Sequence, residues 1–444
     1  MAPRALGMDA FEIDTQWIDA DSDGIRPEFD QTYGSLGIRL DGKWATSFAT
    51  QSGVRGERLE VPSYSIAEWM AENWWALLFE PKKTDIAEAD LGFRSRHWVG
   101  TARDGFVLPD LWIYPVGRRT VHITAKSASF VHARTELLTS CEAYGSVSDV
   151  TRSLAAFVSK TIKRLKDRGL ESTRLQEVWA AFKKLDEDER RFCELMGALG
   201  LSPYESHSDI EAQLLAISEG TSERVAAEFC EAAGEADFLE AAADMQHALN
   251  ALNSEPEIDL ARLFGISMPS LPGPAWQLGR QMARRVRESL DIDDTDQHGG
   301  QHFFDVFGID RVVREPGLRE MEEPVVHGAL RRADTRVRMN LIRKDSSSRR
   351  FDAARSCFLA WDQSADGERL VTRARVRDQQ ASRTFAAELL APARYIKSRV
   401  KNNLLSPYHA ATIAEELDVS QTVVLWQAKN NGIVVVGAHG GTWT

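Results

Sequence analysis

Two apolar helical patterns between Arg349 and Pro392 constrain the fold of this 444-residue chain more than any other feature. The first spans 349–361, and the second, 380–392, follows a polar turn at 364–367. In the second pattern apolar residues recur at the spacing of a buried helix face: Ala381, Phe385, Ala386, Leu389 and Leu390. Pro392 ends it, because proline lacks the backbone donor that a continuing helix requires. The region therefore predicts two packed helices.

These helices resemble the catalytic core of the ImmA/IrrE family of zinc metallopeptidases, in a long form with an N-terminal extension. The family has Arg-Phe-Thr-x-Ala-His-Glu-x-x-His on the first helix and Glu-Ala-x-x-Phe-Ala-x-x-Leu-Leu-x-Pro on the second. This chain matches the non-catalytic positions: Phe351, Ala354, Phe385, Ala386, Leu389, Leu390 and Pro392. The resemblance covers 274–436, with weaker similarity at 62–80 and 192–204, and it implies a zincin-like α+β domain. An ordinary amphipathic helix hairpin, unrelated to the family, is the alternative.

The positions that would hold zinc carry other residues. The resemblance implies two His one helical turn apart and a carboxylate from the second helix as ligands, with a Glu that deprotonates the bound water. Here Arg355 and Leu359 replace the two His, Ser356 replaces the Glu, and Ala381 stands at the carboxylate position. A guanidinium has no lone pair for a metal, Leu has no donor atom, and a Ser hydroxyl is a poor base. We therefore expect a pseudo-peptidase with a degenerate HExxH motif and neither metal nor cofactor.

A relocated catalytic site is the alternative within this domain. His298, His302 and His327 lie in it, and Cys357 is on the degenerate helix, so a Cys–His pair is conceivable. None of these residues has a signature spacing. The remaining cysteines are far apart and form no metal-type pairs, which is typical of buried thiols in a reducing compartment: Cys141, Cys193 and Cys230.

The upstream residues predict two further domains. Residues 1–146 should form a mostly β domain with a hairpin turn at Asp41-Gly42, an inserted Trp-rich helix at 63–80 and strands at 111–116 and 121–124. Seven of the twelve tryptophans lie in it. They could stack on nucleobases or bind a peptide, but three of them, Trp69, Trp74 and Trp75, lie in the most apolar helix of the domain, which favours packing in the core.

Over 147–266 the apolar residues recur at helical spacing, which predicts a helical bundle. A Pro- and Gly-rich linker follows at 267–273. The pseudo-peptidase domain is then 274–402, and 403–444 is a tail resembling a helix-turn-helix. The predicted fold class is therefore α+β.

The tail contains helical segments at 412–417 and 421–431 around a turn at 418–420. Many DNA-binding domains share this outline. The candidate recognition helix has a single cation, Lys429, whereas DNA binding normally needs several. We therefore favour structural support over DNA reading, although cations just upstream could supply the missing charge.

Charge is unevenly distributed along the chain. The formal net charge is −12, but 331–401 contains 18 Lys/Arg and 8 Asp/Glu, a local charge of +10. This basic body suggests an acidic partner, nucleic acid, or contact with the acidic remainder, and a merely solvated face is an equal alternative. The candidate contacts are Arg338, Arg343, Lys344, Arg349, Arg350, Arg394, Lys397, Arg399, Lys401, Gln421 and Lys429. No apolar run approaches the ~20 residues of a membrane span and no secretory signal is evident, so we expect a cytoplasmic protein without membrane contact.

Three functions follow as hypotheses. The first is a catalytically silent member of the family that binds or regulates a protein partner, such as a repressor, toxin or defence component. The resemblance alone places it in bacterial stress response, toxin–antitoxin control or phage defence. The second is an active metallo-endopeptidase with non-standard ligands. The third is a DNA-binding regulator that uses the basic C-terminal region.

Overall fold

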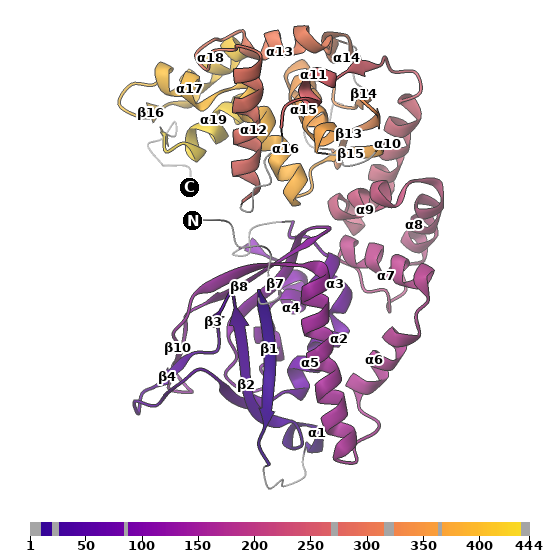
Figure 1. Ribbon diagram of the computed structural model, residues 1–444, viewed down its shortest axis with the longest axis vertical. Coiled ribbons are helices and arrows are strands. Elements are labelled where there is room, and N and C mark those ends of the chain that lie inside the picture. Colours follow the sequence, from indigo (N-terminus) through magenta and orange to yellow (C-terminus); the bar gives the residue numbers. More distant parts are fainter. Residues whose placement is uncertain are drawn as a thin grey trace. The chain divides into compact units, whose positions relative to one another are not determined.

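The computed structural model describes residues 10–19, 26–83, 88–267, 274–314, 324–362 and 366–436. It is a mixed α+β structure with open sheets, which confirms the predicted fold class at this level (Figure 1). The chain divides into two compact units, Met1–His207 and Ser208–Thr444. No helix in the described ranges is both long and apolar enough to cross a membrane.

The first unit contains three sheets followed by three long helices. Its strands are β1 (Phe11–Trp17), β2 (Tyr33–Leu40), β3 (Lys43–Trp44), β4 (Phe48–Thr50), β5 (Arg55–Gly56), β6 (Leu59–Pro62), β7 (Asp110–Gly117), β8 (Thr120–Lys126), β9 (Ala128–Phe130), β10 (Thr135–Leu137) and β11 (Cys141–Ser146). Its helices are α1 (Pro27–Asp30), α2 (Tyr64–Glu72), α3 (Trp74–Phe79), α4 (Leu91–His97), the 3-10 helix η2 (Val99–Ala102), α5 (Val147–Asp167), α6 (Arg174–Lys184) and α7 (Glu187–Leu199). The sheet orders are β1-β2-β3 with β6 beside β2, β5-β4-β10-β9, and β11-β8-β7.

The predicted hairpin is present, with β2 and β3 antiparallel on either side of Asp41-Gly42. Both turn residues have positive φ, 45° and 81°, as a two-residue type I′ turn requires. The predicted continuous helix over 63–80 is instead two helices that meet at Asn73. The Asn73 side chain donates to the carbonyl of Trp69 at 2.8 Å, and this local bond competes with helix continuation.

The helices predicted to form one central bundle are divided between the two units. Helices α5 and α6 contribute Leu154, Phe157 and Trp179 to the apolar core that also contains the inner faces of the β-sheets. Helices α8 to α10 belong to the second unit. Trp74 and Trp75 are buried in the first core, as the packing hypothesis predicted.

The second unit is built around one antiparallel sheet. Its strands are β12 (Ile258–Asp259), β13 (Val326–Ala333), β14 (Arg336–Leu341), β15 (Gly367–Thr372), β16 (Leu404–Leu405) and β17 (Val434–Val435). Its helices are α8 (Ser208–Gly220), α9 (Glu223–Ala232), the 3-10 helix η3 (Glu235–Asp237), α10 (Phe238–Ala251), α11 (Ala261–Phe264), α12 (Ala275–Ser289), α13 (Gly299–Phe307), α14 (Asp310–Arg314), α15 (Ser346–Trp361), α16 (Arg377–Leu390), α17 (Ala393–Arg399), α18 (Pro407–Leu417) and α19 (Gln421–Asn430).

The sheet order in this unit is β12-β14-β13-β15, and helix α15 packs on β13, β14 and β15. Helices α12 and α16 run side by side next to α15, and all three share one apolar core with α19 (Figure 1). Strand β15 was not predicted, because Arg369 interrupts the apolar pattern expected of a buried strand. Its side chain is fully buried and ion-paired.

A buried ion-pair cluster holds the first unit together at the end of α3. The Glu80 carboxylate accepts two hydrogen bonds from Arg96, at 2.7 and 2.6 Å, and lies 3.0 Å from His97 Nε2. The other ring nitrogen of His97 is 2.7 Å from the carbonyl of Ile113 on β7. Burial acts to raise the pKa of Glu80, but Arg96 and His97 lower it to about 2. One carboxylate thereby joins α3, α4 and β7.

We predict that Glu80→Gln lowers the free energy of unfolding by about 3 kcal/mol at pH 7, because it leaves the partly buried Arg96 guanidinium without its charged partner. Since folding depresses the pKa of Glu80, its contribution is complete above pH 4.5 and is lost as the pH falls towards 2. Urea unfolding at a series of pH values measures both effects. Glu142→Gln is the matched control, because the Glu142 side chain paired with His122 is 63% exposed and should contribute under about 1 kcal/mol. Equal losses in the two variants would contradict the prediction.

Candidate functional site

The candidate site lies where α15 packs against α16. Helix α15 begins after Asp345, whose side chain accepts a hydrogen bond from the backbone N–H of Ser348 at 2.8 Å. Phe358 of α15 and Phe385 of α16 pack with their ring centroids 5.3 Å apart. The two helices predicted from sequence are therefore adjacent, and the degenerate motif positions of α15 lie in the protein interior.

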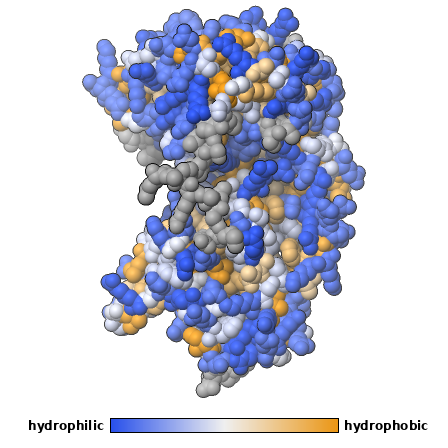
Figure 2. All heavy atoms as spheres, viewed as in Figure 1, coloured by the Kyte–Doolittle hydropathy of each residue, from blue (hydrophilic) through white to orange (hydrophobic). Residues whose placement is uncertain are grey.

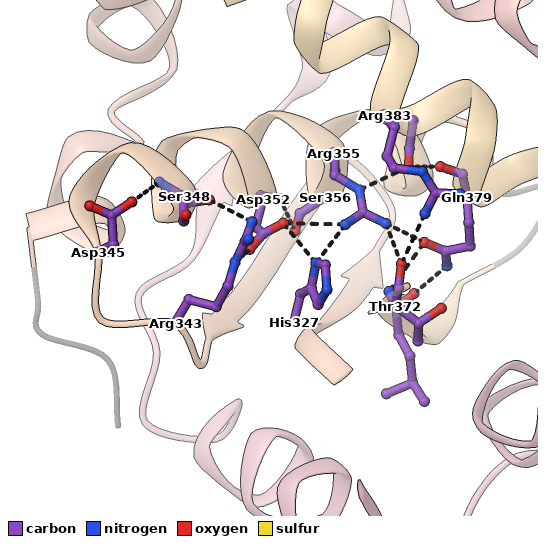
Figure 3. Close-up of polar contacts among 12 residues, drawn as sticks. His327, Arg343, Asp345, Ser348, Asp352, Arg355, Ser356, Thr372, Gln379 and Arg383 are labelled. Carbon is purple, nitrogen blue, oxygen red and sulfur yellow. Dashed lines mark hydrogen bonds and ion pairs between the residues drawn. The ribbon is translucent and has the colours of Figure 1, made fainter. Parts of the chain in front are cut away.

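Arg355 occupies the centre of the site and is completely buried. Its Nε donates to Ser382 Oγ at 3.2 Å, and its Nη2 donates to the carbonyl of Thr372 at 2.6 Å and to Gln379 Oε1 at 2.8 Å. Its Nη1 donates to His327 Nδ1 at 2.8 Å and contacts Asp352 Oδ1 at 3.3 Å (Figure 3). A guanidinium has five N–H donors, and five acceptors surround this one. No donor of Arg355 is left for a further ligand.

Asp352 is the carboxylate that balances this cation. It is completely buried, and its Oδ2 accepts a hydrogen bond from Arg343 Nε at 2.7 Å. Burial acts to raise the pKa of Asp352, but Arg343, His327 and Arg355 together hold it far below its usual range. Burial lowers the pKa of Arg355 to about 9, against the effect of Asp352, so the guanidinium remains charged at neutral pH. The centre is thus a buried Arg–Asp–Arg cluster.

His327 enters the site from an irregular part of β13. The register with β15 shifts between Val326 and Gly328, and such a bulge turns a side chain away from the regular pleat. Burial lowers the pKa of His327 to about 4, so the ring is neutral at pH 7. His327 Nδ1 lies 2.8 Å from Arg355 Nη1, which can only donate, and 3.2 Å from Asp352 Oδ1, which can only accept. The shorter contact favours the tautomer in which Nδ1 accepts from Arg355 and Nε2 holds the proton. Nε2 is buried and has no hydrogen-bond partner among the described residues.

The other two degenerate positions of α15 are also engaged within the fold. Ser356 Oγ donates to the carbonyl of Asp352 at 2.8 Å, and Ser356 is completely buried. The hydroxyl is therefore buried, and a backbone carbonyl accepts its hydrogen bond. Leu359 is part of the apolar core, and its carbonyl accepts from Arg369 Nη1 at 3.2 Å.

The fourth degenerate position, Ala381, lies where α12 crosses α16. A Cβ placed on Gly279 of α12 would stand 2.2 Å from the carbonyl oxygen of Ala381, so only glycine permits this approach. The α16 side chains that reach Arg355 are those of Gln379 and Ser382. On α16, the structure therefore places Gln379 at the site. Gln379 lies two residues before Ala381, the position matched from the sequence.

Some of the same side chains cover the free edge of β15 near its C-terminal end. Four of the outward backbone groups of this strand belong to Leu370 and Thr372, and side chains bind each of these four. Glu228 Oε2 of α9 accepts from the Leu370 N–H at 2.7 Å. Gln379 donates to the Leu370 carbonyl at 2.8 Å and accepts from the Thr372 N–H at 3.2 Å. Arg355 binds the Thr372 carbonyl. An extended peptide needs such groups to add as a strand, and here they are already occupied.

A second buried charge cluster joins β15 to α9 and α16. Arg369 Nε donates to Glu228 Oε1 at 2.8 Å, and its Nη2 donates to Asp378 Oδ2 at 2.5 Å. Asp362, at the end of α15, lies near this cluster. Burial and the neighbouring Asp378 raise the pKa of Asp362 to about 6, despite the opposing effect of Arg369.

Of the residues considered for a relocated catalytic site, only His327 lies at this centre. His298 and His302 are exposed on or next to α13. Cys357 is completely buried, and burial raises the pKa of its thiol to about 12, so it remains protonated at neutral pH. Within the described ranges, no three His, Cys, Asp or Glu residues are grouped so that they could hold a metal ion.

Several of the basic residues expected to contact a partner instead bind other groups of the chain. Arg349 and Arg350 are buried, which corrects their assignment as surface contacts. Arg349 donates to the carbonyls of Val313 and Leu341, and Arg350 donates to Gln301. Buried polar groups need such partners, and the sequence pattern does not reveal them.

Three further basic candidates form ion pairs within the chain: Arg338 with Glu257, Arg343 with Asp352, and Arg399 with Glu416. The remaining candidates are exposed: Lys344, Arg394, Lys397, Lys401, Gln421 and Lys429.

Fold and site together define an α+β chain whose candidate centre is a buried arginine between two packed helices. No protein-family model, curated protein or solved structure matches the chain. The interpretation of the centre therefore depends on its own geometry and on the sequence resemblance.

We predict that Arg355→Met lowers the free energy of unfolding by about 3 to 5 kcal/mol, because it leaves buried acceptors and part of the Asp352 charge without a partner. Arg355→Lys should rescue little of this loss, since an ammonium has three donors in place of five. Urea unfolding measures both variants. Arg394→Met, at an exposed arginine, is the control and should change stability by less than about 0.5 kcal/mol. A loss below about 1 kcal/mol for Arg355→Met would contradict the geometry described.

We predict that Asp362→Asn stabilises the protein at pH 7 by about 1 to 2 kcal/mol and has almost no effect at pH 4. The folded-state pKa of Asp362 is raised from 3.8 to about 6, so its favourable contribution is present below pH 3.8 and lost as the pH rises through 6. Asparagine removes that loss. Thermal unfolding at pH 4 and pH 7 measures the difference, and equal effects at the two values would refute the assignment.

Proposed function

We propose that the second unit is a catalytically silent, metallopeptidase-like domain that serves as a regulatory or binding component for a protein partner. The observation that carries the proposal is the buried Arg355, whose five donors meet five acceptors at the position where the resemblance expects the first zinc ligand. A fixed cation at this position repels a divalent metal and leaves no coordination site beside it.

The occupied backbone groups of Leu370 and Thr372 at the edge of β15 support the same proposal. A peptidase that binds its substrate as an added strand needs free backbone donors and acceptors beside the catalytic residues. In this chain, side chains from α9, α15 and α16 bind those groups. The proposed silencing would then have two parts. The zinc-binding side chains are replaced, and the strand edge that a peptide substrate would bind is occupied.

The resemblance suggests how such a domain would be used. Active members of the family cleave repressors, and a silent relative would bind the same kind of target without cutting it. The proposed setting remains bacterial stress response, toxin–antitoxin control or phage defence.

The two alternative functions have less support. An active metallo-endopeptidase would need ligands that the described residues do not group together. A DNA-binding regulator would use α18 and α19, but Gln427 of α19 donates to the buried Glu388 and to the Ala391 carbonyl, which suits a supporting role.

Zinc binding by the purified protein tests the proposal. We expect equilibrium dialysis with Zn²⁺, followed by metal analysis, to find well below one zinc per chain at neutral pH. A variant with four substitutions, Arg355→His, Ser356→Glu, Leu359→His and Gln379→Glu, restores the zinc ligands and the general base on the two helices. It should bind zinc if the helices retain a peptidase framework, and circular dichroism establishes whether this variant folds.

Wild-type protein that holds stoichiometric zinc, and loses proteolysis of an unfolded casein substrate on chelation, would overturn the proposal. Zinc in the restored variant but not in the wild type would support it. The same restored helix with Gln379 unchanged is the control for the fourth ligand and should bind zinc more weakly.

A further inference from the structure

His97 of α4 is a buried histidine whose two ring nitrogens both face acceptors. Hydrophilic side chains cover most of the face of the molecule shown in Figure 2, as expected for groups that water solvates, whereas His97 is 0% exposed. Its Nδ1 lies 2.7 Å from the carbonyl oxygen of Ile113, and its Nε2 lies 3.0 Å from Glu80 Oε2. A carbonyl oxygen can only accept, and so can an ionised carboxylate. Each ring nitrogen of His97 therefore needs a proton of its own.

The surroundings keep Glu80 ionised, so that it cannot supply either proton. Arg96 donates to Oε2 and Oε1 of Glu80 at 2.7 and 2.6 Å, and the pKa of this carboxyl is lowered to about 2. The Phe93 ring is stacked on His97 with the centroids 3.9 Å apart, and an aromatic face favours a cation. A solvated histidine is largely neutral at pH 7. The contacts of His97 instead require a buried imidazolium.

His122 of β8 has the opposite requirement, although it also lies beside a glutamate. Its Nε2 is 3.1 Å from Glu142 Oε2, which accepts, but its Nδ1 is 2.7 Å from the Tyr114 hydroxyl, which can donate. A neutral ring with its proton on Nε2 satisfies both partners. Burial lowers the pKa of His122, which also favours the neutral ring. The first unit thus contains an internal control for His97.

Glu80 is the carboxylate that contacts the His97 ring. Helix α4 packs on α3, β7 and η2, and η2 contains no titratable side chain. The other charged or titratable groups near this junction are Asp90 and Glu205, which act on Arg96; Asp110, which accepts from two indoles; Tyr114, with Lys82 over its ring; and Lys83, which donates to the Leu199 carbonyl. None of these groups replaces Glu80 as the acceptor for Nε2.

The end of α7 packs directly against the same carboxylate. A Cβ placed on Gly200, which follows α7, would stand 2.6 Å from Glu80 Oε1. Lys83 Nζ also donates to the carbonyl of Leu199 at 3.1 Å. The position of Glu80 therefore affects α7 as well as α4 and β7. If His97 lost one proton, a nitrogen lone pair would face either Glu80 or the Ile113 carbonyl, and a buried acceptor would lose its donor.

We infer that His97 is a pH-sensitive switch, whose doubly protonated ring holds the end of α3, α4 and β7 together and whose loss of one proton in alkaline solution loosens this junction and the end of α7. The sign follows from the protons. The stabilisation is present while the ring holds both protons, and it is lost as the pH rises and one proton leaves. The switch lies in the first unit and does not depend on the silent-domain proposal.

Long-range proton–nitrogen NMR of the full chain, labelled at histidine, measures the protonation of each ring. An imidazolium gives two similar nitrogen shifts, whereas a neutral ring gives two widely separated ones. We expect a doubly protonated His97 and a neutral His122 at pH 7, each assigned by the signal that disappears in His97→Gln or His122→Gln. A neutral His97 at pH 7 would overturn the inference.

Glu80→Gln separates the charge of this partner from its shape, because the amide oxygen can still accept from Nε2. His97 should then lose its proton at a pH at least about one unit lower than in the wild type. Glu142→Gln is the control and should leave the titration of His97 unchanged. An unchanged titration in Glu80→Gln would contradict the proposed role of the pair, even if His97→Gln failed to fold.

Hydrogen exchange measured by mass spectrometry, corrected for the intrinsic effect of pH on exchange, tests the loosening. Protection of residues 74–80, 91–97 and 196–201 should fall at least about tenfold from pH 6 to pH 9 in the wild type and in His122→Gln. His97→Gln, whose amide has a single donor group for two acceptors, should be weakly protected at both pH values. Equal protection of the wild type at pH 6 and pH 9 would overturn the switch, as would an equal fall in His97→Gln.

Discussion

The compensation of buried charge around Arg355 is the constraint on which the second unit depends. A guanidinium inside a protein is tolerated only if every donor is bound and a counter-charge is close. Here Asp352 supplies the charge, and His327, Thr372, Gln379 and Ser382 supply the other acceptors. These groups come from α15, α16, β13 and the end of β15, so one side chain fixes the position of two helices on the sheet.

That constraint connects structure to the proposed loss of chemistry. A metallopeptidase keeps an open coordination position on its metal and an accessible strand edge, and the polar groups at both places are free to bind a ligand. In this chain, donors and acceptors of the chain itself bind the polar groups at the corresponding places. In the proposed silent domain this exchange would favour stability over catalysis, because Arg355 and the outward backbone groups of Leu370 and Thr372 are bound within the fold.

Local sequence patterns predicted the elements whose causes are local. The Asp41-Gly42 turn needs positive φ, and the helices at α15, α16, α18 and α19 follow from periodicity and from the end signal at Pro392. Patterns failed where one side-chain contact decides. The Asn73 break depends on a local side-chain bond to Trp69, and β15 contains Arg369, whose burial depends on the distant Glu228 of α9 and on Asp378. The two central arginines assigned to the surface, Arg349 and Arg350, are buried for the same reason.

The sequence by itself determined that Arg355, Ser356 and Leu359, the α15 positions matched to the family motif by resemblance, carry no His or Glu side chain. It also determined the helical periods and the uneven charge. Only the tertiary structure decided that Gln379 and Ser382, not Ala381, meet Arg355, and that Asp352 and His327 join them. The physical reason is that a hydrogen bond between residues 24 or 28 positions apart depends on helix rotation and sheet register. These are set by packing across the whole unit, which no short stretch of sequence contains.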